Sequence, residues 1–192
     1  MKKIFIAIFA MIFTLPELAF AHSGGTEGAF MSGLGHPVLG LDHLLAMLSV
    51  GILSAQMGGR SIWSVPLTFV IIMLLGGVLG MNDIPVFSVE LGIAISVILL
   101  GIAIASEKKL VPLLAMLFVG IFAIFHGHAH GTEMPYLAEP ALYTLGFITG
   151  TISIHILGVL ISYILQKLKY GEQVLRFLGA GIAGIGVYLL SM

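Results

Sequence analysis

Residues 35–47 read Gly35-His36-Pro37-Val38-Leu39-Gly40-Leu41-Asp42-His43-Leu44-Leu45-Ala46-Met47, at the start of a long apolar run. A second stretch, Phe125-His126-Gly127-His128-Ala129-His130-Gly131-Thr132-Glu133-Met134-Pro135, ends another apolar run. Moving imidazole and carboxylate groups into apolar surroundings costs free energy unless a partner or ligand compensates for the lost water. Because these groups are also good ligands for divalent transition metals, the two stretches indicate a membrane protein that handles a metal ion.

The composition of the 192-residue chain points to the same class of protein. Hydrophobic residues make up 59% and charged residues 9%, and the mean hydropathy is +1.15, which leaves too little polar surface for a soluble domain. We therefore expect an all-α integral membrane protein. The net charge of −1 gives no indication of nucleic-acid binding. The absence of cysteine excludes disulfides and thiolate metal sites.

The first segment has the three marks of a cleaved signal peptide: a basic start, a short apolar run and a small-x-small pattern. These are Lys2 and Lys3, Ile4–Leu15, and Ala19-Phe20-Ala21. Cleavage of residues 1–21 would leave His22 first, where its α-amine and imidazole can chelate one metal ion together. The alternative is an uncleaved signal anchor, which the short apolar run with Pro16 and Glu17 disfavours.

Six apolar runs follow, each long enough to cross a bilayer, which takes roughly 17 to 25 helical residues. They are Pro37–Met57, Ile62–Gly80, Ile84–Ser106, Leu110–His126, Ala141–Leu165 and Val174–Leu190. Charged, glycine-rich or proline-containing connections separate them, so we expect a single domain, residues 22–192, with six transmembrane helices. The pairs Gly76/Gly80 and Gly146/Gly150 have the small-xxx-small spacing that predicts close helix packing.

The basic residues predict the orientation of these helices. Every Lys and Arg after the predicted signal peptide lies in or just beyond the connections that follow the first, third and fifth apolar runs. These residues are Arg60, Lys108, Lys109, Lys167, Lys169 and, just beyond, Arg176. Because cytoplasmic loops carry an excess of Lys and Arg, we expect the mature N-terminus and the C-terminus on the periplasmic side of a bacterial inner membrane. Both histidine-containing stretches then lie at the external face.

The first stretch offers a metal site if its helix is continuous. His36, His43 and Met47 then lie within about 20° of one azimuth, and Asp42 lies about 100° away. Asp42 can complete the site from the side or orient His43 through its second ring nitrogen. The alternative is that His36 caps the helix before Pro37 and that Asp42 and His43 form a packing hydrogen bond. An Asp-His pair without a function is uncommon in lipid, which favours the metal site.

The second stretch offers imidazoles in either of two conformations. A continuing helix places His126 and His130 on one face, whereas extended backbone places His126, His128 and His130 on one side. In either conformation we expect the three imidazoles to converge. The alternative, which applies to His128 in particular, is a solvated histidine-rich loop. Glu133 can act as an oxygen ligand or hold a histidine tautomer.

Two more polar side chains are predicted deeper along a path. Glu90 lies six residues into the third run, about 9 Å from its external end, and a carboxylate there needs a cation or a proton. His155 lies about 21 Å deep in the fifth run. It is either a relay ligand or a partner in a helix–helix hydrogen bond.

The patterns His36-Pro37-x-x-Gly40-x-Asp42-His43-x-x-Ala46-Met47 and Phe125-His126-Gly127-x-Ala129-His130-Gly131-x-Glu133 resemble those of the HupE/UreJ family of nickel permeases. Members of that family accompany hydrogenase or urease systems, and the resemblance covers essentially the whole chain. It implies uptake of nickel, with cobalt as the alternative, and a link to hydrogenase or urease maturation. It also implies functional roles for His36, Asp42, His43, His126, His130 and Glu133.

We therefore expect a permease that binds a divalent transition metal and passes it inward. Imidazoles with carboxylates suit nickel, cobalt, zinc and copper(II), so nickel selectivity must come from geometry or availability. The chain lacks the G-x-x-x-x-G-K-[ST] pattern of an ATP-binding loop. An inside-negative potential of 100 mV supplies about 4.6 kcal/mol for a divalent cation. The metal is substrate rather than a permanent cofactor, and the other partner is the bilayer, not nucleic acid.

Two rival classes of function use the same residues. An intramembrane metalloenzyme would use metal-bound water as nucleophile and Glu133 as base. The sequence lacks the H-E-x-x-H and G-x-S-x-G motifs, which argues against an enzyme. The other rival is a non-transporting periplasmic metal-binding accessory protein. Substrate-dependent metal accumulation in cells distinguishes the permease from the metalloenzyme and from the accessory protein.

Overall fold

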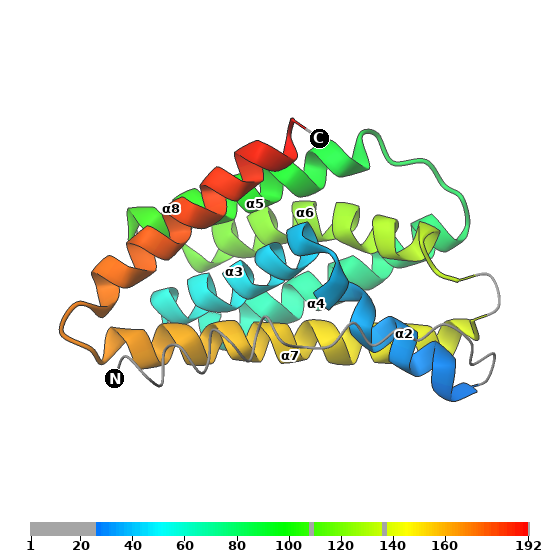
Figure 1. The fold of residues 1–192 in the computed structure, drawn as a ribbon, viewed down its shortest axis with the longest axis horizontal. Helices are drawn as coiled ribbons and strands as arrows, with labels where there is room; N and C mark the ends of the chain where they lie inside the picture. Colours follow the sequence, from blue (N-terminus) through cyan, green and yellow to red (C-terminus); the bar gives the residue numbers. More distant parts are fainter. Residues whose placement is uncertain (1–25, 108–109, 136–137, 192) are drawn as a thin grey trace.

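A computed structural model of the chain describes residues 26–107, 110–135 and 138–191, and every regular element in these ranges is an α-helix (Figure 1). The helices are α2 (Thr26–Leu39), α3 (Leu41–Met57), α4 (Ser61–Met81), α5 (Val89–Ser106), α6 (Pro112–Thr132), α7 (Pro140–Gln166) and α8 (Gly171–Leu189). The predicted signal peptide, its cleavage site and His22 lie outside the described residues.

Four helices are long and apolar enough to cross a membrane, namely α4, α5, α6 and α7. The mean hydropathy of the most apolar 18-residue stretch of each is between 1.8 and 2.3. The bent pair α2–α3 raises this number to as many as five if it counts as one span. The starts of two of these helices follow from their sequence, since Pro112 and Pro140 stand at the first helical positions. The carboxylate of Glu139 also caps α7 by accepting from the backbone of Leu142 at 2.8 Å. The chain is therefore an all-α, multi-pass membrane protein.

The first predicted helix is broken. Gly40 has an extended backbone (φ −84°, ψ 112°) between α2 and α3, and the two helix axes are bent by 81°. The expectation that His36, His43 and Met47 share one face of a continuous helix is therefore wrong. Glycine has a poor helix propensity, and the Gly40 carbonyl instead accepts from Leu44 at 2.9 Å to begin α3.

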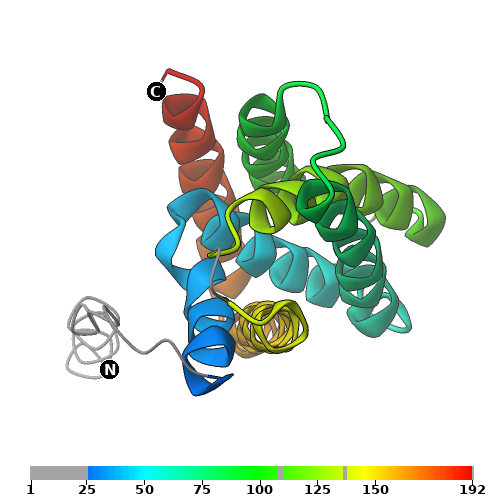
Figure 2. The same ribbon diagram turned by 90° about the vertical axis from the view of Figure 1, so that its right-hand side faces the viewer.

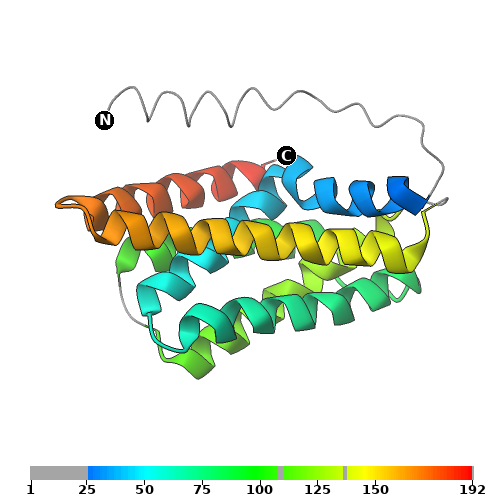
Figure 3. The same cartoon turned by 90° about the horizontal axis from the view of Figure 1, so that it is seen from below.

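Helix α7 positions both halves of this broken helix. A methyl group added at Gly33 of α2 would collide with the backbone of Tyr143, and one added at Gly146 of α7 would collide with that of Phe30. Helix α2 therefore packs closely along the first part of α7 (Figure 3). Further along, Gly51 of α3 meets the backbone of His155. Together α2 and α3 follow α7 along its length.

Glycines also bring α6 against α4. A methyl group at Gly76 or Gly80 would meet the α6 backbone, and one at Gly127 or Gly131 would meet that of α4. The predicted close packing through Gly76/Gly80 and Gly146/Gly150 is confirmed. This contact holds the histidines of α6 inside the protein.

The described basic residues gather at one end of the bundle. The ends of α3, α5 and α7 lie together on the left of Figure 1. Arg60 stands at the junction of α3 and α4, Lys167 and Lys169 stand between α7 and α8, and Arg176 lies in the second turn of α8. The opposite end holds the end of α6 and the start of α7. This distribution agrees with the one-sided placement of charge expected from the sequence.

Three helix boundaries differ clearly from the predicted runs. Helix α2 begins at Thr26, well before the predicted start at Pro37, which lies inside the helix. Helix α5 begins at Val89 rather than Ile84, after Ser88 in a left-handed conformation (φ 49°), and α6 continues past His126 to Thr132. Glu90 therefore lies in the first turn of α5 rather than six residues into a span. All three histidines of residues 126–130 are helical.

Candidate metal-binding site

Four imidazoles form a continuous series of ring contacts in the half of the bundle where α6 ends. Ring centroids lie 4.8 Å apart for His36 and His130, 4.3 Å for His130 and His43, and 4.9 Å for His43 and His126. These side chains come from α2, α3 and α6. Figure 2 looks onto this end, where α2, the end of α6 and the start of α7 lie next to one another. The break at Gly40 and the packing of α6 on α4 together create this series.

The outer end of the series is open to solvent. Nε2 of His36 and Oε2 of Glu133 are 2.9 Å apart, and their side chains are 25% and 50% exposed. The hydrogen bond from His36 holds the pKa of the Glu133 carboxyl below its ordinary value of 4.5. His36, His130 and Glu133 each offer a ligand atom, and all three atoms lie within 4.8 Å of one another. This is a suitable group of ligands for a divalent transition-metal ion.

Asp42 orients the imidazole of His43. Its Oδ1 accepts hydrogen bonds from the backbone nitrogen of His43 at 2.8 Å and from Nδ1 at 2.9 Å. An ionised carboxylate can only accept, so Nδ1 carries the proton and Nε2 carries the lone pair. Nε2 is buried and has no hydrogen-bond partner among the residues that the structure describes. This geometry matches the second of the two roles that the sequence left open for Asp42.

Ser96 sets the tautomer of His126 in the same way. The Ser96 hydroxyl donates to the carbonyl of Ile93 at 2.6 Å, so its oxygen accepts from Nε2 of His126 at 2.9 Å. The lone pair of His126 is then on Nδ1, in a side chain that is 0% exposed. Within the described ranges Nδ1 has no partner, and the same holds for both ring nitrogens of the buried His130. Buried nitrogens without partners cost free energy, and a metal ion bound to them would compensate for that cost.

The sequence model of one family, described as HupE / UreJ protein, matches residues 10–189. The chain belongs to the HupE/UreJ family. It is 42% identical over 176 residues to "Protein HupE" of Rhizobium leguminosarum bv. viciae, an alignment that covers 92% of each chain. No solved structure matches the chain. The family assignment made from the two motifs is therefore confirmed.

His128 of this HupE/UreJ member does not join the other imidazoles. Successive helical residues are 100° apart, so His128 lies on the side of α6 opposite to His126 and His130. Its Nε2 donates to the carbonyl of Ile84 at 2.9 Å, which fastens the connection between α4 and α5 to α6. The expectation that three imidazoles converge is wrong, because the segment is helical. His128 is also buried, so the alternative of a solvated loop does not hold either.

The two deeper candidates have different surroundings. Glu90 is exposed in the first turn of α5, and the structure does not bring it to the four imidazoles. His155 is buried on α7. The ring centroids of His155 and Phe69 lie 5.3 Å apart, and those of Phe69 and His126 lie 5.6 Å apart. His155 therefore stands one aromatic ring beyond the inner end of the series.

Sequence reasoning missed several residues that surround the imidazoles. Ser96 is the only hydroxyl side chain between Leu91 and Ala105, and that isolation is a usable signal. Tyr143 and Phe147 stand four residues apart on α7, and their rings lie 6.0 Å from His36 and 4.3 Å from His130. Nothing in the pattern of apolar residues distinguishes Phe147 from its neighbours.

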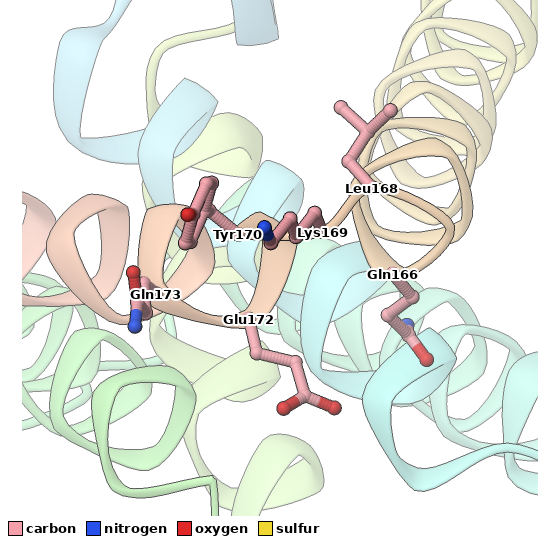
Figure 4. Close-up of a pocket in the computed structure, with 6 residues that line it drawn as sticks. All are labelled: Gln166, Leu168, Lys169, Tyr170, Glu172 and Gln173. Carbon is pink, nitrogen blue, oxygen red and sulfur yellow. The ribbon is translucent and has the colours of Figure 1, made fainter.

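An open cavity of about 300 Å³ lies at the opposite end of the HupE/UreJ bundle. Figure 4 shows the residues that line it, which come from the end of α7, the turn after it and the start of α8: Gln166, Leu168, Lys169, Tyr170, Glu172 and Gln173. No histidine lines this cavity, and it contains no group suited to hold a soft or borderline metal. The candidate metal site is therefore the series of imidazoles.

Proposed function

We propose that this HupE/UreJ member is a permease that carries a divalent transition-metal ion, in the first place nickel, from outside the cell to the cytoplasm. The observation that carries the proposal is the series His36, His130, His43 and His126. It begins at a partly exposed His–Glu pair and continues into buried imidazoles whose free nitrogens have no hydrogen-bond partner among the described residues. An ion that enters at Glu133 meets one ligand after another as it loses water. We expect no catalytic activity.

The proposed topology has six crossings after removal of a signal peptide. The bent pair α2–α3 forms the first crossing, α4 to α7 form the next four, and α8 forms the sixth. Support comes from the packing of α2 and α3 along α7 and from the described basic residues at one end. The histidine series then opens on the periplasmic side of a bacterial inner membrane, where both termini also lie.

Reporter fusions test this topology. Fusions after Gly59, Lys109 and Lys169 should report the cytoplasm, and fusions near Asn82 and Thr132 the outside. An external signal at Lys109 contradicts the six crossings. Intact-mass analysis should find residues 1–21 removed, and their retention contradicts the cleaved signal and the proposed role of His22.

The inward direction follows from the membrane potential. An inside-negative potential of 100 mV supplies about 4.6 kcal/mol for each divalent ion, so ATP hydrolysis is not required. Neutral imidazoles and a carboxylate bind nickel, cobalt, zinc and copper(II), so choice among them rests on the geometry of the four rings and on availability. The resemblance to nickel permeases leads us to propose that the metal supplies a hydrogenase or urease.

Radioactive nickel uptake at limiting external metal tests the function, with cobalt, zinc and copper(II) as competitors. His43→Ala should lower uptake to below roughly a tenth of the wild-type rate at unchanged abundance in the membrane. His128→Ala is the matched control, since it also removes a buried imidazole but leaves the series intact, and it should keep most of the uptake. Full accumulation by both Asp42→Ala and His43→Ala would exclude the proposed entry site. Metal binding without accumulation by the wild type would favour an accessory protein.

A further inference from the structure

One face of α7 follows the histidine series inward. Tyr143, Phe147, Thr151 and His155 stand four residues apart, and all four are buried. Tyr143 contacts the ring of His36, and Phe147 contacts that of His130. From Tyr143 to His155 this face covers about 18 Å at 1.5 Å per residue. The face therefore leads from the partly exposed entrance to a point well inside the protein.

His155 stands at the inner end of this face. Its side chain is 3% exposed, and in the described part of the chain neither ring nitrogen makes a hydrogen bond. The helix–helix hydrogen bond considered from the sequence is thus not formed there. A neutral imidazole has one N–H group and one lone pair, so burying both without partners costs free energy. Such a group in a proposed metal path is a candidate ligand.

The ring of Phe69 separates His155 from the outer imidazoles. Phe69 comes from α4, is 0% exposed and contacts both His126 and His155 through its ring. Two imidazoles that bind one ion each place a nitrogen about 2.1 Å from it, a distance known for zinc. With an aromatic ring between them, His126 and His155 cannot share an ion in this arrangement.

We propose that His155 is a second, inner binding position for a divalent transition metal and that the ring of Phe69 is the barrier an ion must displace to reach it. The proposal rests on the proposed permease function. Beside His155, one turn earlier on α7, the hydroxyl of Thr151 donates to the sulfur of Met73 at 3.9 Å. An imidazole with a thioether and a hydroxyl nearby suits a borderline ion such as nickel better than magnesium or calcium.

Nickel binding and nickel transport test the inner position separately. For His155→Ala, equilibrium dialysis of the purified protein should give the wild-type affinity for the first ion, because the outer ligands are intact. Uptake into proteoliposomes should fall roughly tenfold or more. Ile154→Ala is the matched control, since Ile154 is the buried neighbour on α7 and has no ligand atom. Equal losses of uptake in both variants, or wild-type uptake by His155→Ala, would overturn the inner position.

The number of bound ions gives a measurement that does not depend on transport. Removing the barrier with Phe69→Ala should allow a second nickel ion to bind at equilibrium, and adding His155→Ala should abolish that second ion. Phe69→Leu keeps most of the packing volume and serves if Phe69→Ala does not fold. Identical stoichiometry with and without His155 in the Phe69 variants would overturn the proposal, even if the wild type transports nickel.

The absence of native cysteine makes the barrier directly measurable. In His155→Cys, a membrane-impermeant thiol reagent applied from outside should fail to label the new thiol while Phe69 is present. The same reagent should label it when Phe69→Ala is added. Phe147→Ala is the control, because Phe147 contacts His130 rather than His155. Labelling of His155→Cys with Phe69 intact, or unchanged protection with Phe69→Ala, would overturn the barrier. Because this assay involves no metal, it separates failure of the barrier from failure of the proposed transport function.

Discussion

The carboxylate of Asp42 accepts a hydrogen bond from Nδ1 of His43 at 2.9 Å, and this fixes which nitrogen of the imidazole carries the lone pair. The lone pair lies on Nε2, within a series of three other imidazoles. We therefore propose that Asp42 acts on a metal ion through His43 rather than by binding it. Such carboxylate–histidine pairs raise the basicity of the ligand and fix its orientation.

Removing the Asp42 carboxylate should weaken nickel binding less than removing the His43 imidazole. For Asp42→Ala we expect an affinity about 10 to 100 times lower, as for other partners that orient a metal-binding histidine. Asp42→Asn keeps a carbonyl oxygen that can accept from Nδ1, so it should retain more affinity than Asp42→Ala. Isothermal titration calorimetry of the purified variants measures the order. Equal affinity of Asp42→Ala and wild type would show that His43 needs no orienting partner.

Ser96 should matter for the same reason. In Ser96→Ala the Nε2–H of His126 loses its acceptor in a buried position, which costs on the order of 1–3 kcal/mol. We expect a lower thermal midpoint and weaker nickel binding. Ser54→Ala is the matched control, because the Ser54 hydroxyl is also buried but donates to the backbone of Gly51, away from the series. Similar effects of the two substitutions on nickel affinity would contradict the role given to Ser96.

Nickel binding should weaken on acidification because protons compete for the imidazoles, which bind metal in their neutral form. The ordinary pKa of histidine is about 6.5. The pKa of Glu133 is held below 4.5, so this carboxylate stays ionised across the range in which the imidazoles gain protons. Its bond with His36 is favoured above the ordinary pKa of Glu133 and is lost only as pH falls through the lowered value. Glu133→Gln should therefore weaken binding near neutral pH without moving the midpoint of the pH profile. A clear shift of that midpoint would assign the titration to Glu133.

The hydrogen-bonded pair of Asp42 and His43 lies close to the Cα of Gly40, where a side chain would crowd it. A methyl group there would meet Oδ1 of Asp42 at 3.0 Å and Nδ1 of His43 at 3.3 Å. Gly40→Ala should therefore disturb this hydrogen-bonded pair and lower nickel affinity. Gly35→Ala is the control, since a methyl group at Gly35 meets nothing within 4 Å. Unchanged affinity in Gly40→Ala, measured by equilibrium dialysis, would show that the pair adapts.

Close packing of α6 on α4 should set the stability of the whole site. In Gly127→Ala the new methyl group would collide with the backbone of Met73, so we expect a loss of folded protein or a clearly lower thermal midpoint. Gly181→Ala on α8 meets open space and should be neutral. Fluorescence-detected size-exclusion chromatography after heating compares the two in detergent. Equal midpoints would contradict the packing described for α4 and α6.

The sequence predicted the helices that carry the candidate ligands better than it predicted the arrangement of those side chains. Helical spacing places His126 and His130 on one face, and the helix does continue through them. The break at Gly40 was not predictable from the sequence, because glycine is common inside membrane helices. The direction of α2 also depends on its close packing against α7 at Gly33, which is a tertiary contact. The partner of His126 is Ser96, thirty positions away, and helical periodicity carries no information about such a pair. The position of Glu90 was misjudged because α5 starts only after Ser88 adopts a positive φ.

Helix formation in α6 changes which ligands a metal ion can use. In the unfolded chain His126, His128 and His130 are close neighbours in a flexible segment and can chelate one ion together. In the folded protein His128 points away, and its two neighbours are joined instead by side chains from α2 and α3. If an ion binds the unfolded chain as well as the folded one, it raises the free energy of unfolding by less than binding to the native site alone would. Excess nickel should therefore raise the unfolding temperature of this protein by less than its affinity for the folded state alone would predict. Excess nickel can also hold newly made chains in a non-native, chelated form.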